Sequence, residues 1–270
     1  MRVSEILDAL SCVSFRTLSL AVRSPSTLRS YVSSCLKAYD ELVGNGLPGQ
    51  GPLTPPEDAT ITLPAFHAGG GMSFDELAHL ARVTRTLKPK TVFEIGTYNG
   101  LATSVFMLNS EPGTRIFTLD LPIGPDGGEE REGRGDEHAA SAALSEYLLT
   151  DKHLVASRQL GQVPRALGLQ SYTQLLCDSI VFDPEPYLDS VDLGLIDGAH
   201  DVVHVRNDTV KMARMISASG MVFWHDYGGK GILRPLASYL ESVAVHCPLY
   251  RVPGTTLAWA RGRDLKGALG

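Results

Sequence analysis

The sequence lacks several features that mark particular classes of protein. It has no run of about 18 consecutive apolar residues, so a membrane-spanning helix is excluded. Positive charge is scarce, with a formal net charge of −6, and nucleic acid is therefore not the expected partner. Cysteine is also rare and never occurs as a Cys-x-x-Cys pair, which argues against a disulfide framework and a zinc finger. We interpret the four cysteines as reduced thiols in a cytoplasmic protein: Cys12, Cys35, Cys177 and Cys247.

The N-terminal region leaves an alternative to a cytoplasmic location. The first forty residues are rich in Ser and Arg, which is also typical of an organelle transit peptide. The apolar run near the start is interrupted by Ser11, Ser14 and Arg16, and this argues against a secretory signal.

Two regions of different composition follow each other along the chain. Residues 1–45 carry apolar side chains at helical spacing on both sides of Pro25, and residues 44–71 are rich in Gly, Pro and Thr. We therefore predict an N-terminal helical appendage with a linker over residues 1–70, and a main domain over residues 71–270. The two amphipathic helices would either cap the site of the main domain or pair with a second copy of the chain as a homo-oligomer.

The main domain shows an alternation of strand and helix patterns, which predicts a mostly parallel sheet. Ser73 is expected to cap a helix that ends near Pro89, with Glu76 completing a capping box. The last two strands are separated only by Pro253-Gly254, too short for a crossover, so we expect an antiparallel hairpin. Strands are predicted at residues 91–96, 115–120, 172–177, 191–197, 221–226, 245–252 and 255–260, and further helices at about 100–109, 139–149, 201–217 and 231–243.

This pattern predicts an α/β fold of the Rossmann-like type, with a mostly parallel seven-stranded sheet, a C-terminal antiparallel hairpin and helices on both faces. Residues 122–138 interrupt it with a charged, Gly-rich segment. That segment is either a lid over the site or a solvated loop.

The most informative segment is Thr91–Gly100, which reads as a buried strand, a glycine turn and the start of a helix. Glu94 lies at the carboxyl end of the strand, where open α/β sheets bind their ligands. A carboxylate there would repel a pyrophosphate and attract a cation. The segment also lacks the G-x-G-x-x-G pattern, which argues against a nicotinamide dinucleotide. A cofactor that carries amino and sulfonium groups, such as S-adenosylmethionine (SAM), suits it better.

Five motifs in this order resemble the class I SAM-dependent methyltransferases, in the branch of small-molecule O-methyltransferases (methyltransferase domain 24 type). The resemblance covers about residues 70–262. The motifs are Glu94–Gly100, Phe117–Asp120, Cys177–Ser179, Asp192–His200 and Val222–Tyr227.

The resemblance implies which residues bind SAM. Asp120 would hold the ribose hydroxyls, since a carboxylate can accept from both, and Asp178 with Ser179 would take the adenine. Cys177 stands where the family usually has glycine, which puts the fine packing of the adenine in doubt. The complete set of expected cofactor-binding residues is Glu94, Gly96, Thr97, Tyr98, Gly100, Asp120, Asp178, Ser179 and Asp197.

The resemblance also implies the catalytic residues. Catechol-type relatives carry Asp-Ala-x-Lys after the fourth strand and Asp-Asn after the fifth, where acids bind Mg²⁺ and the lysine is the base. Here the motifs read Asp197-Gly-Ala-His200 and His225-Asp226. We therefore expect His200 as the base, Asp197 and His225 as further catalytic residues, and Asp197 and Asp226 as ligands of a divalent ion. His225 would act as a base, as a ligand or as a residue that orients Asp226. Mg²⁺ prefers oxygen ligands, so His225 weakens the case for Mg²⁺ itself.

The expected function is transfer of a methyl group from SAM to a hydroxyl of a small-molecule acceptor. Two alternatives stay open: a catalytically silent SAM-binding regulatory or assembly protein, and an iron-dependent oxidative enzyme on the same fold. Several residues also allow other readings: His200 and His204 as a zinc-binding pair, Trp224 and Tyr227 as core or acceptor-pocket residues, and His67 at the mouth of the cofactor site or on the surface.

Overall fold

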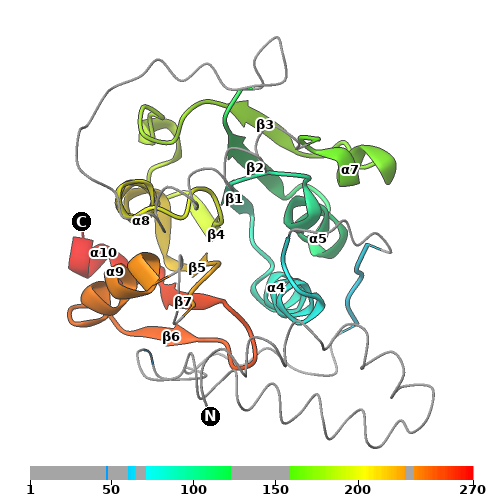
Figure 1. The fold of residues 1–270 in the computed structure, drawn as a ribbon. Helices are drawn as coiled ribbons and strands as arrows, with labels where there is room; N and C mark the ends of the chain where they lie inside the picture. The colour runs from blue at the N-terminus through cyan, green and yellow to red at the C-terminus, as the bar shows by residue number, and fades with distance from the viewer. Residues whose placement is uncertain (1–46, 48–59, 65–70, 123–158, 229–233, 270) are drawn as a thin grey trace, which may run out of the picture. The chain divides into compact units, whose positions relative to one another are not determined.

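The computed structural model describes residues 47, 60–64, 71–122, 159–228 and 234–269 (Figure 1). The predicted N-terminal helices, most of the linker with His67, the segment 123–138 and the helix at 139–149 lie outside the described residues. Within the described part of the chain, no helix is long and apolar enough to cross a membrane.

A seven-stranded sheet forms the centre of the main domain, in the order β3-β2-β1-β4-β5-β7-β6 (Figure 1). The pairs among β1 to β5 are parallel, whereas β7 is antiparallel to both β5 and β6. The predicted fold class is therefore confirmed, including the antiparallel hairpin at the end. The strands are β1 (Thr91–Ile95), β2 (Arg115–Asp120), β3 (Thr173–Leu176), β4 (Val191–Ile196), β5 (Ile216–Trp224), β6 (Leu249–Arg251) and β7 (Ala258–Arg261).

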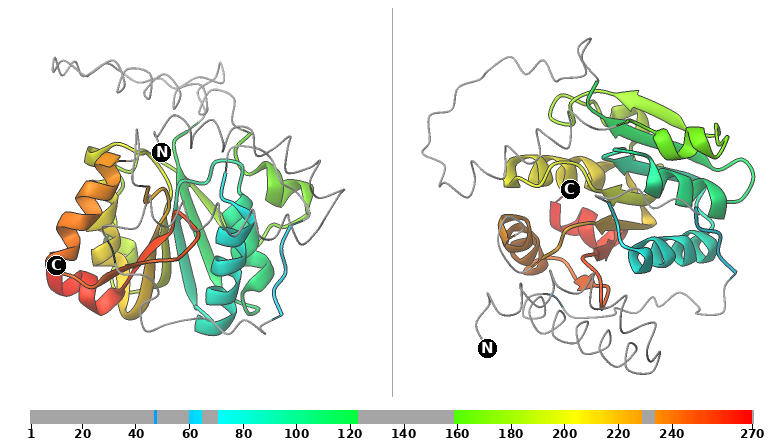
Figure 2. Two further views of the ribbon diagram at one scale, coloured as in Figure 1. Left: turned by 60° about the horizontal axis from the view of Figure 1, so that its bottom comes forward. Right: turned by 45° about the vertical axis from the view of Figure 1, so that its right-hand side comes forward.

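Helices cover both faces of the sheet (Figure 2). This explains why all five residues of the central strand β1 are buried and why its sequence is a nearly continuous apolar run. One face carries α4 (Phe74–Leu87), α5 (Leu101–Asn109) and α7 (Gln162–Ala166), and the other carries α8 (Val202–Met215), α9 (Arg234–Ala244) and α10 (Gly262–Leu269).

The predicted capping box of α4 is confirmed. Glu76 N donates to Ser73 Oγ at 3.4 Å, and Ser73 N donates to Glu76 Oε2 at 2.7 Å. These two contacts satisfy backbone N–H groups that have no partner within the helix. They also fix the position of the Glu76 carboxylate, whose other contacts are described below.

The structure differs from the predicted elements in a few places. Strand β5 begins at Ile216 rather than near residue 221, because residues 217–219 are small or polar and partly exposed and so give no apolar signal. Helices α7 and α10 and the short 3₁₀ helix Glu185–Tyr187 were not predicted. The hairpin connection runs over residues 252–257, longer than Pro253-Gly254 alone, and Val252 N donates to Leu257 O across it at 2.8 Å.

The strand order changes direction between β1 and β4, which are neighbours in the sheet although β2 and β3 lie between them in the sequence. In open α/β sheets, ligands bind outside the carboxyl ends of the strands at such a switch point. The segments that follow β1, β2, β3, β4 and β5 all lie along this edge, and they carry the residues singled out from the sequence.

Candidate functional site

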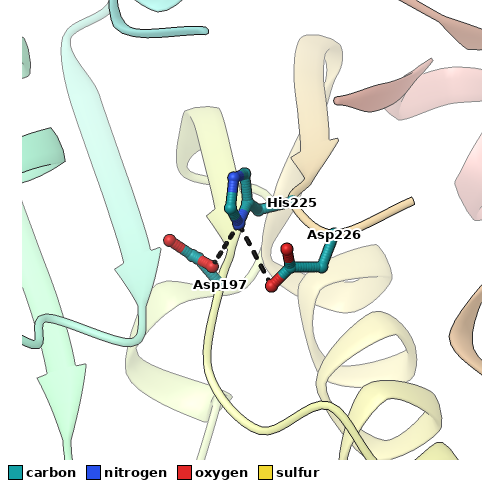
Figure 3. Close-up of side chains that lie close together, drawn as sticks. All are labelled: Asp197, His225 and Asp226. Atoms are coloured by element: carbon teal, nitrogen blue, oxygen red, sulfur yellow. Dashed lines mark ion pairs between the residues drawn. The ribbon is translucent and has the colours of Figure 1, made fainter. Parts of the chain in front are cut away.

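Three side chains of the predicted site meet where β4 and β5 end (Figure 3). Asp197 directly follows β4, and His225 with Asp226 directly follows β5. The two strands are paired up to Ile196 and Trp224, so the sheet register itself brings the next residues together. The ligand atoms of Asp197, His225 and Asp226 all lie within 4.8 Å of one another.

His225 lies between the two acids. Its Nδ1 is 2.9 Å from Asp197 Oδ1 and 3.2 Å from Asp226 Oδ2. These contacts are ion pairs, because neither oxygen has hydrogen-bond geometry with the buried Nδ1. Burial alone would lower the pKa of His225, but the charge of Asp197 and the contacts to Asp226 and Glu76 raise the pKa well above its usual value. Without a ligand, the ring is therefore an imidazolium that neutralises the carboxylates around it.

The two acids respond differently to this environment. Burial raises the pKa of Asp197, and the neighbouring His225 only partly offsets this rise. Burial would also raise the pKa of Asp226, but the hydrogen bond with His200 and the close charge of His225 lower its pKa far below the usual range. Asp226 is thus the acid that stays ionised at all ordinary pH values.

His200 is held by Asp226, with 2.6 Å between His200 Nε2 and Asp226 Oδ2. Asp201 caps helix α8 by accepting from the backbone N–H groups of Val203 and His204, and this places His200 just before the first turn. Because an ionised carboxylate only accepts hydrogen bonds, the Nε2 atom of His200 carries a proton. The basic nitrogen of the neutral ring is then Nδ1.

His200 and His204, whose spacing would also suit a zinc-binding pair, are held by different acids. His204 Nδ1 lies 2.6 Å from Asp201 Oδ2, so the two imidazoles have different acidic partners. Among the described residues, the group with metal-ligand geometry is instead Asp197, His225 and Asp226.

Asp226 has a left-handed backbone conformation, with φ at 61°. Non-glycine residues rarely adopt this conformation, although Asp and Asn tolerate it best. Such strained residues cluster at functional sites and persist where surrounding contacts hold them. Here the turn directs the Asp226 carboxylate towards His200 and His225 rather than along the strand direction.

The glycine turn after β1 is required by packing inside the protein. Gly96 has φ at 101°, and a Cβ atom at this position would lie 2.0 Å from Asp197 O. Gly100 has φ at 81°, and its Cβ would lie 2.6 Å from Pro164 Cδ. The two glycines therefore allow the turn to pack against Asp197 and Pro164, in addition to any approach to a ligand.

Asp120 and Asp178 hold backbone turns. Asp120 Oδ2 accepts from Tyr98 N at 2.8 Å, and its Oδ1 accepts from Leu121 N at 2.7 Å. Tyr98 has a left-handed backbone with φ at 48°, so this contact fixes the most strained position of the glycine turn. Asp178 Oδ1 accepts from Ile180 N at 2.9 Å. Both acids lie at the strand ends where the sequence predicted them.

Two of the predicted cofactor residues have side chains in the interior. Glu94 is 1% exposed and accepts a hydrogen bond from Thr103 Oγ1 of helix α5. Burial raises the pKa of Glu94 to about 8, so its carboxyl group is mainly neutral at pH 7. Thr97 Oγ1 lies 2.6 Å from Thr118 Oγ1 and accepts from Gln174 Nε2 at 2.9 Å.

Helix α8 anchors the loop that carries Ser179. Ser179 O accepts from Asn207 Nδ2 at 2.9 Å and from Lys211 Nζ at 2.5 Å. Lys211 Nζ also donates to the carbonyl groups of Ile180 and Phe182. Sequence reasoning missed Asn207 and Lys211, because single polar residues within a helix pattern give no signal of such a role.

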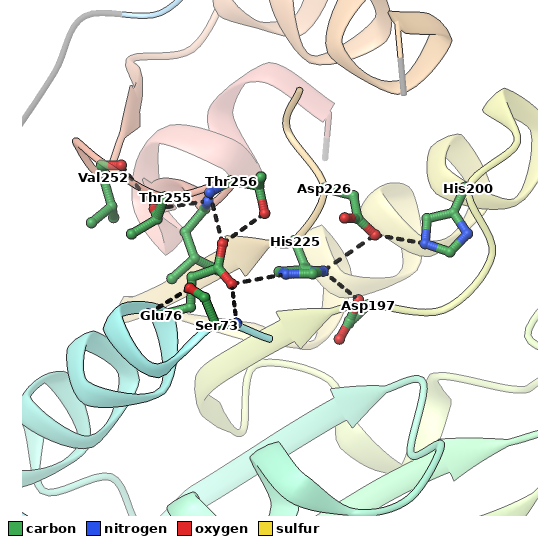
Figure 4. A network of polar contacts seen from close by, with 10 residues as sticks. Ser73, Glu76, Asp197, His200, His225, Asp226, Val252, Thr255 and Thr256 are labelled. Atoms are coloured by element: carbon green, nitrogen blue, oxygen red, sulfur yellow. Dashed lines mark hydrogen bonds and ion pairs between the residues drawn. The ribbon is translucent and has the colours of Figure 1, made fainter. Parts of the chain in front are cut away.

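Glu76 is an acid that sequence reasoning placed only in the cap of α4 and not in the site. Its Oε2 lies 3.3 Å from His225 Nε2, on the side of the ring opposite Asp197 and Asp226 (Figure 4). Trp224 and Tyr227, which the sequence left open, are buried in the interior. Trp224 Nε1 donates to Thr209 Oγ1 at 2.9 Å, and Tyr227 Oη accepts from Leu47 N at 3.0 Å.

Comparison with known families gives a match over residues 93–227, half of the chain, to a model described as a methyltransferase domain (type 24). This match includes β1 from Phe93 onward, the glycine turn and all three residues Asp197, His225 and Asp226. A comparison with curated proteins found no significant match.

Several solved structures with similar folds and low sequence identity are described as methyltransferases. The SAH-bound methyltransferase PaMTH1 of Podospora anserina is 12% identical, with a TM-score of 0.50 over 71% of this chain and 79% of that chain. The O-methyltransferase TomG of Streptomyces achromogenes, in complex with SAM, is 12% identical, with a TM-score of 0.45 over 71% and 81%. A methyltransferase of Geobacter sulfurreducens is 14% identical, with a TM-score of 0.44 over 70% and 78%. At these identities the likeness concerns the fold.

Proposed function

Because this chain belongs to the methyltransferase domain family, we propose that it transfers a methyl group from SAM to a hydroxyl of a small-molecule acceptor. The observation that carries the proposal is the contact of 2.6 Å between His200 Nε2 and Asp226 Oδ2. It supplies an oriented base at the carboxyl edge of the sheet, beside the acids that follow β4 and β5. The acceptor itself is a small metabolite with an alcohol or phenol group.

The chemistry of the switch-point edge fits a cationic nucleoside. Asp120 ends β2, and Asp178 and Asp197 come after β3 and β4. This concentration of acids favours a sulfonium over a pyrophosphate. In this proposal Asp120 and Asp178 hold the ribose and adenine, and the turn 96–100 borders the methionine part. When bound, SAM supplies a methyl group on a positively charged sulfur.

Methyl transfer from a sulfonium is an in-line displacement. The acceptor oxygen forms a bond to the methyl carbon, the bond between carbon and sulfur breaks, and its electron pair goes to sulfur. The leaving group is neutral, so catalysis depends on alignment of the acceptor and on removal of its proton.

His200 is the residue proposed to take that proton. Asp226 fixes its Nε2 in the protonated state, so the neutral ring accepts the hydroxyl proton at Nδ1. The ionised Asp226 then stabilises the imidazolium that forms, which is how carboxylates commonly support a histidine base. Each turnover releases the methylated acceptor, the demethylated cofactor and one proton.

The residues around His225 also fit a divalent metal ion. Asp197, His225 and Asp226 provide three ligand atoms within 4.8 Å of one another, and His225 Nδ1 is buried without a hydrogen-bond partner. A bound ion would lower the pKa of the acceptor hydroxyl. One nitrogen and two carboxylate ligands suit Mn²⁺, Fe²⁺, Co²⁺ or Zn²⁺ better than Mg²⁺, which prefers oxygen.

Two experiments test the proposed function. Isothermal titration of the full chain with SAM is expected to give saturable binding, and absence of binding at millimolar SAM would reject the proposal. Methyl-labelled SAM is then incubated with a panel of phenols, sugars and polyketide alcohols, with and without added Mg²⁺ or Mn²⁺. Labelled product is expected with wild type and not with H200Q, which keeps a polar side chain but cannot act as the base.

The alternative from the sequence, a silent SAM-binding regulatory or assembly protein, predicts a different outcome. Such a protein would bind SAM tightly and form no labelled product with any acceptor of the panel. The H200Q variant would then behave like wild type in both experiments.

A further inference from the structure

Glu76 differs from an ordinary helix-capping residue in its burial and in its number of partners. It is 4% exposed, and both carboxylate oxygens accept hydrogen bonds. Oε1 accepts from the backbone N–H and the hydroxyl of Thr256, each at 2.7 Å. Oε2 accepts from Ser73 N at 2.7 Å and from His225 Nε2 at 3.3 Å. Capping of α4 uses only the contact with Ser73, so capping does not explain the others.

These contacts connect three segments that are far apart in the sequence (Figure 4). Ser73 lies at the start of α4, Thr256 lies in the connection between β6 and β7, and His225 directly follows β5. A buried carboxylate is costly unless charged or polar partners surround it. The Glu76 carboxylate is therefore held firmly from two sides, and its position does not depend on His225 alone.

The position of this carboxylate fixes the state of the His225 ring. An ionised carboxylate only accepts hydrogen bonds, so His225 Nε2 must present its N–H to Glu76. The opposite ring nitrogen, Nδ1, then faces Asp197 and Asp226 at 2.9 and 3.2 Å. A flip of the ring would remove the Nε2 contact and turn a C–H group towards the acids.

We propose that Glu76 is a positioning residue, which holds His225 with Nε2–H directed to Glu76 and with Nδ1 directed to Asp197 and Asp226. This inference rests on the proposed function, because it assigns Glu76 to the same site. It extends the site from the sheet edge to the first turn of α4. The arrangement is the one in which a histidine donates one N–H to a carboxylate and presents its other nitrogen to a reacting group or an ion.

The test measures the His225 ring itself and needs neither SAM nor an acceptor. Full-length protein with ¹⁵N-labelled histidine is studied by NMR at one fixed pH, and the His225 signals are assigned by their loss in H225N. In wild type we expect a protonated Nε2 whose N–H exchanges slowly with solvent. In E76Q this N–H signal should be lost or should exchange at least about tenfold faster, the factor expected for loss of a hydrogen bond to a charged group.

Two variants provide matched controls. S73A removes the Oγ contact that caps α4 but keeps the backbone N–H of residue 73 as a donor to Glu76. T256V removes one hydroxyl contact to Oε1 and leaves Oε2 unchanged. Both variants should lower the melting temperature while the Nε2–H signal of His225 stays as in wild type.

The outcomes separate this inference from the proposed function. An unchanged His225 signal in folded E76Q would overturn the positioning role, whether or not the protein binds SAM. If E76Q fails to fold, the wild-type spectrum alone tests the positioning role. An unprotonated Nε2 of His225, or an Nε2–H that exchanges rapidly, would contradict the contact with Glu76. Failure of SAM to bind would instead reject the proposed function and leave the ring measurement standing.

Discussion

Two regions of the same sheet edge use their acids in different ways. At the ends of β2 and β3, Asp120 and Asp178 accept hydrogen bonds from backbone N–H groups and so hold turns in place. At the ends of β4 and β5, the acids instead face imidazoles, with Asp226 next to both His200 and His225. We call these the backbone-supported region and the histidine region.

The difference shows how one edge can serve two purposes. A carboxylate that holds backbone amides fixes the shape of a turn, and shape is what recognition of a cofactor needs. A carboxylate that faces an imidazole controls where protons reside, and this is what deprotonation of an acceptor needs. Each region can therefore be altered separately.

The junction between the regions is expected to be the most sensitive position. A Cβ atom at Gly96 would lie 2.0 Å from the backbone oxygen of Asp197, so G96A must push the ends of β1 and β4 apart. We expect a loss of about 5 kcal/mol or more in the free energy of unfolding, or failure to fold. Urea denaturation measures this loss.

G113A is the matched control. Gly113 also has a positive φ, at 90°, but a Cβ there would meet nothing within 4 Å. G113A should therefore lower the free energy of unfolding by only about 1–2 kcal/mol, through backbone strain. Equal losses in both variants would show that strain, and not the contact with Asp197, makes Gly96 necessary.

The buried Glu94 beneath the glycine turn is expected to make stability depend on pH. Its pKa is raised from 4.5 to about 8, so the folded protein holds a proton that the unfolded chain releases at lower pH. Stability should therefore fall as the pH rises from about 4.5 to 8, by about 5 kcal/mol at most.

E94Q keeps an acceptor for Thr103 but cannot ionise. Its stability should therefore not decrease over this pH range through this group. Urea denaturation of both proteins across this pH range measures the difference, since other groups contribute equally to both. Parallel curves for wild type and E94Q would contradict the raised pKa.

In the histidine region, D226N is expected to reduce methyl transfer with little effect on folding. Asn tolerates the left-handed backbone as well as Asp does, but it lacks the charge that orients His200 and stabilises its protonated form. We expect the turnover rate to fall by about 10²- to 10⁴-fold. The assay is labelled methyl transfer to an acceptor found in the panel.

The affinity of D226N for SAM should stay within about twofold of wild type, a free-energy change well below 1 kcal/mol. A parallel loss of SAM affinity and turnover would place Asp226 in the cofactor site instead. A rate equal to that of wild type would exclude Asp226 as the partner of the base.

Much of the fold could be predicted from local sequence patterns. The apolar run of β1 indicated a strand covered on both faces, and Ser73 with Glu76 indicated the start of α4. Both signals come from residues that are close together in the sequence, so their spacing is visible without knowledge of the fold. The predicted start of β5 was wrong because residues 217–219 give no apolar signal, although they belong to the amino-terminal part of the strand.

The candidate site was only partly predictable, because some of its contacts join residues that are far apart in the sequence. The order of the strands places Asp197, His225 and Asp226 together, so their meeting follows from the fold class. The second role of Glu76 does not, because its partners His225 and Thr256 lie 149 and 180 residues away in the sequence. The position of Glu94 near a strand end also does not reveal that its side chain points into the interior. The direction of this side chain depends on how the strand packs against α5.

In the backbone-supported region, D120N should produce the smallest effect of these variants. In contrast to D226N, it should weaken binding of SAM and leave turnover nearly unchanged. Asn keeps one acceptor oxygen, so the variant loses the carboxylate's second contact, to either Tyr98 N or Leu121 N. We expect binding of SAM to weaken about tenfold, or about 1.4 kcal/mol, as measured by isothermal titration. Turnover at saturating SAM should stay close to wild type, because His200 keeps its partner Asp226. If D120N instead lowered turnover while SAM affinity was preserved, the two regions would not be separate, and the acids along this edge would act as one network.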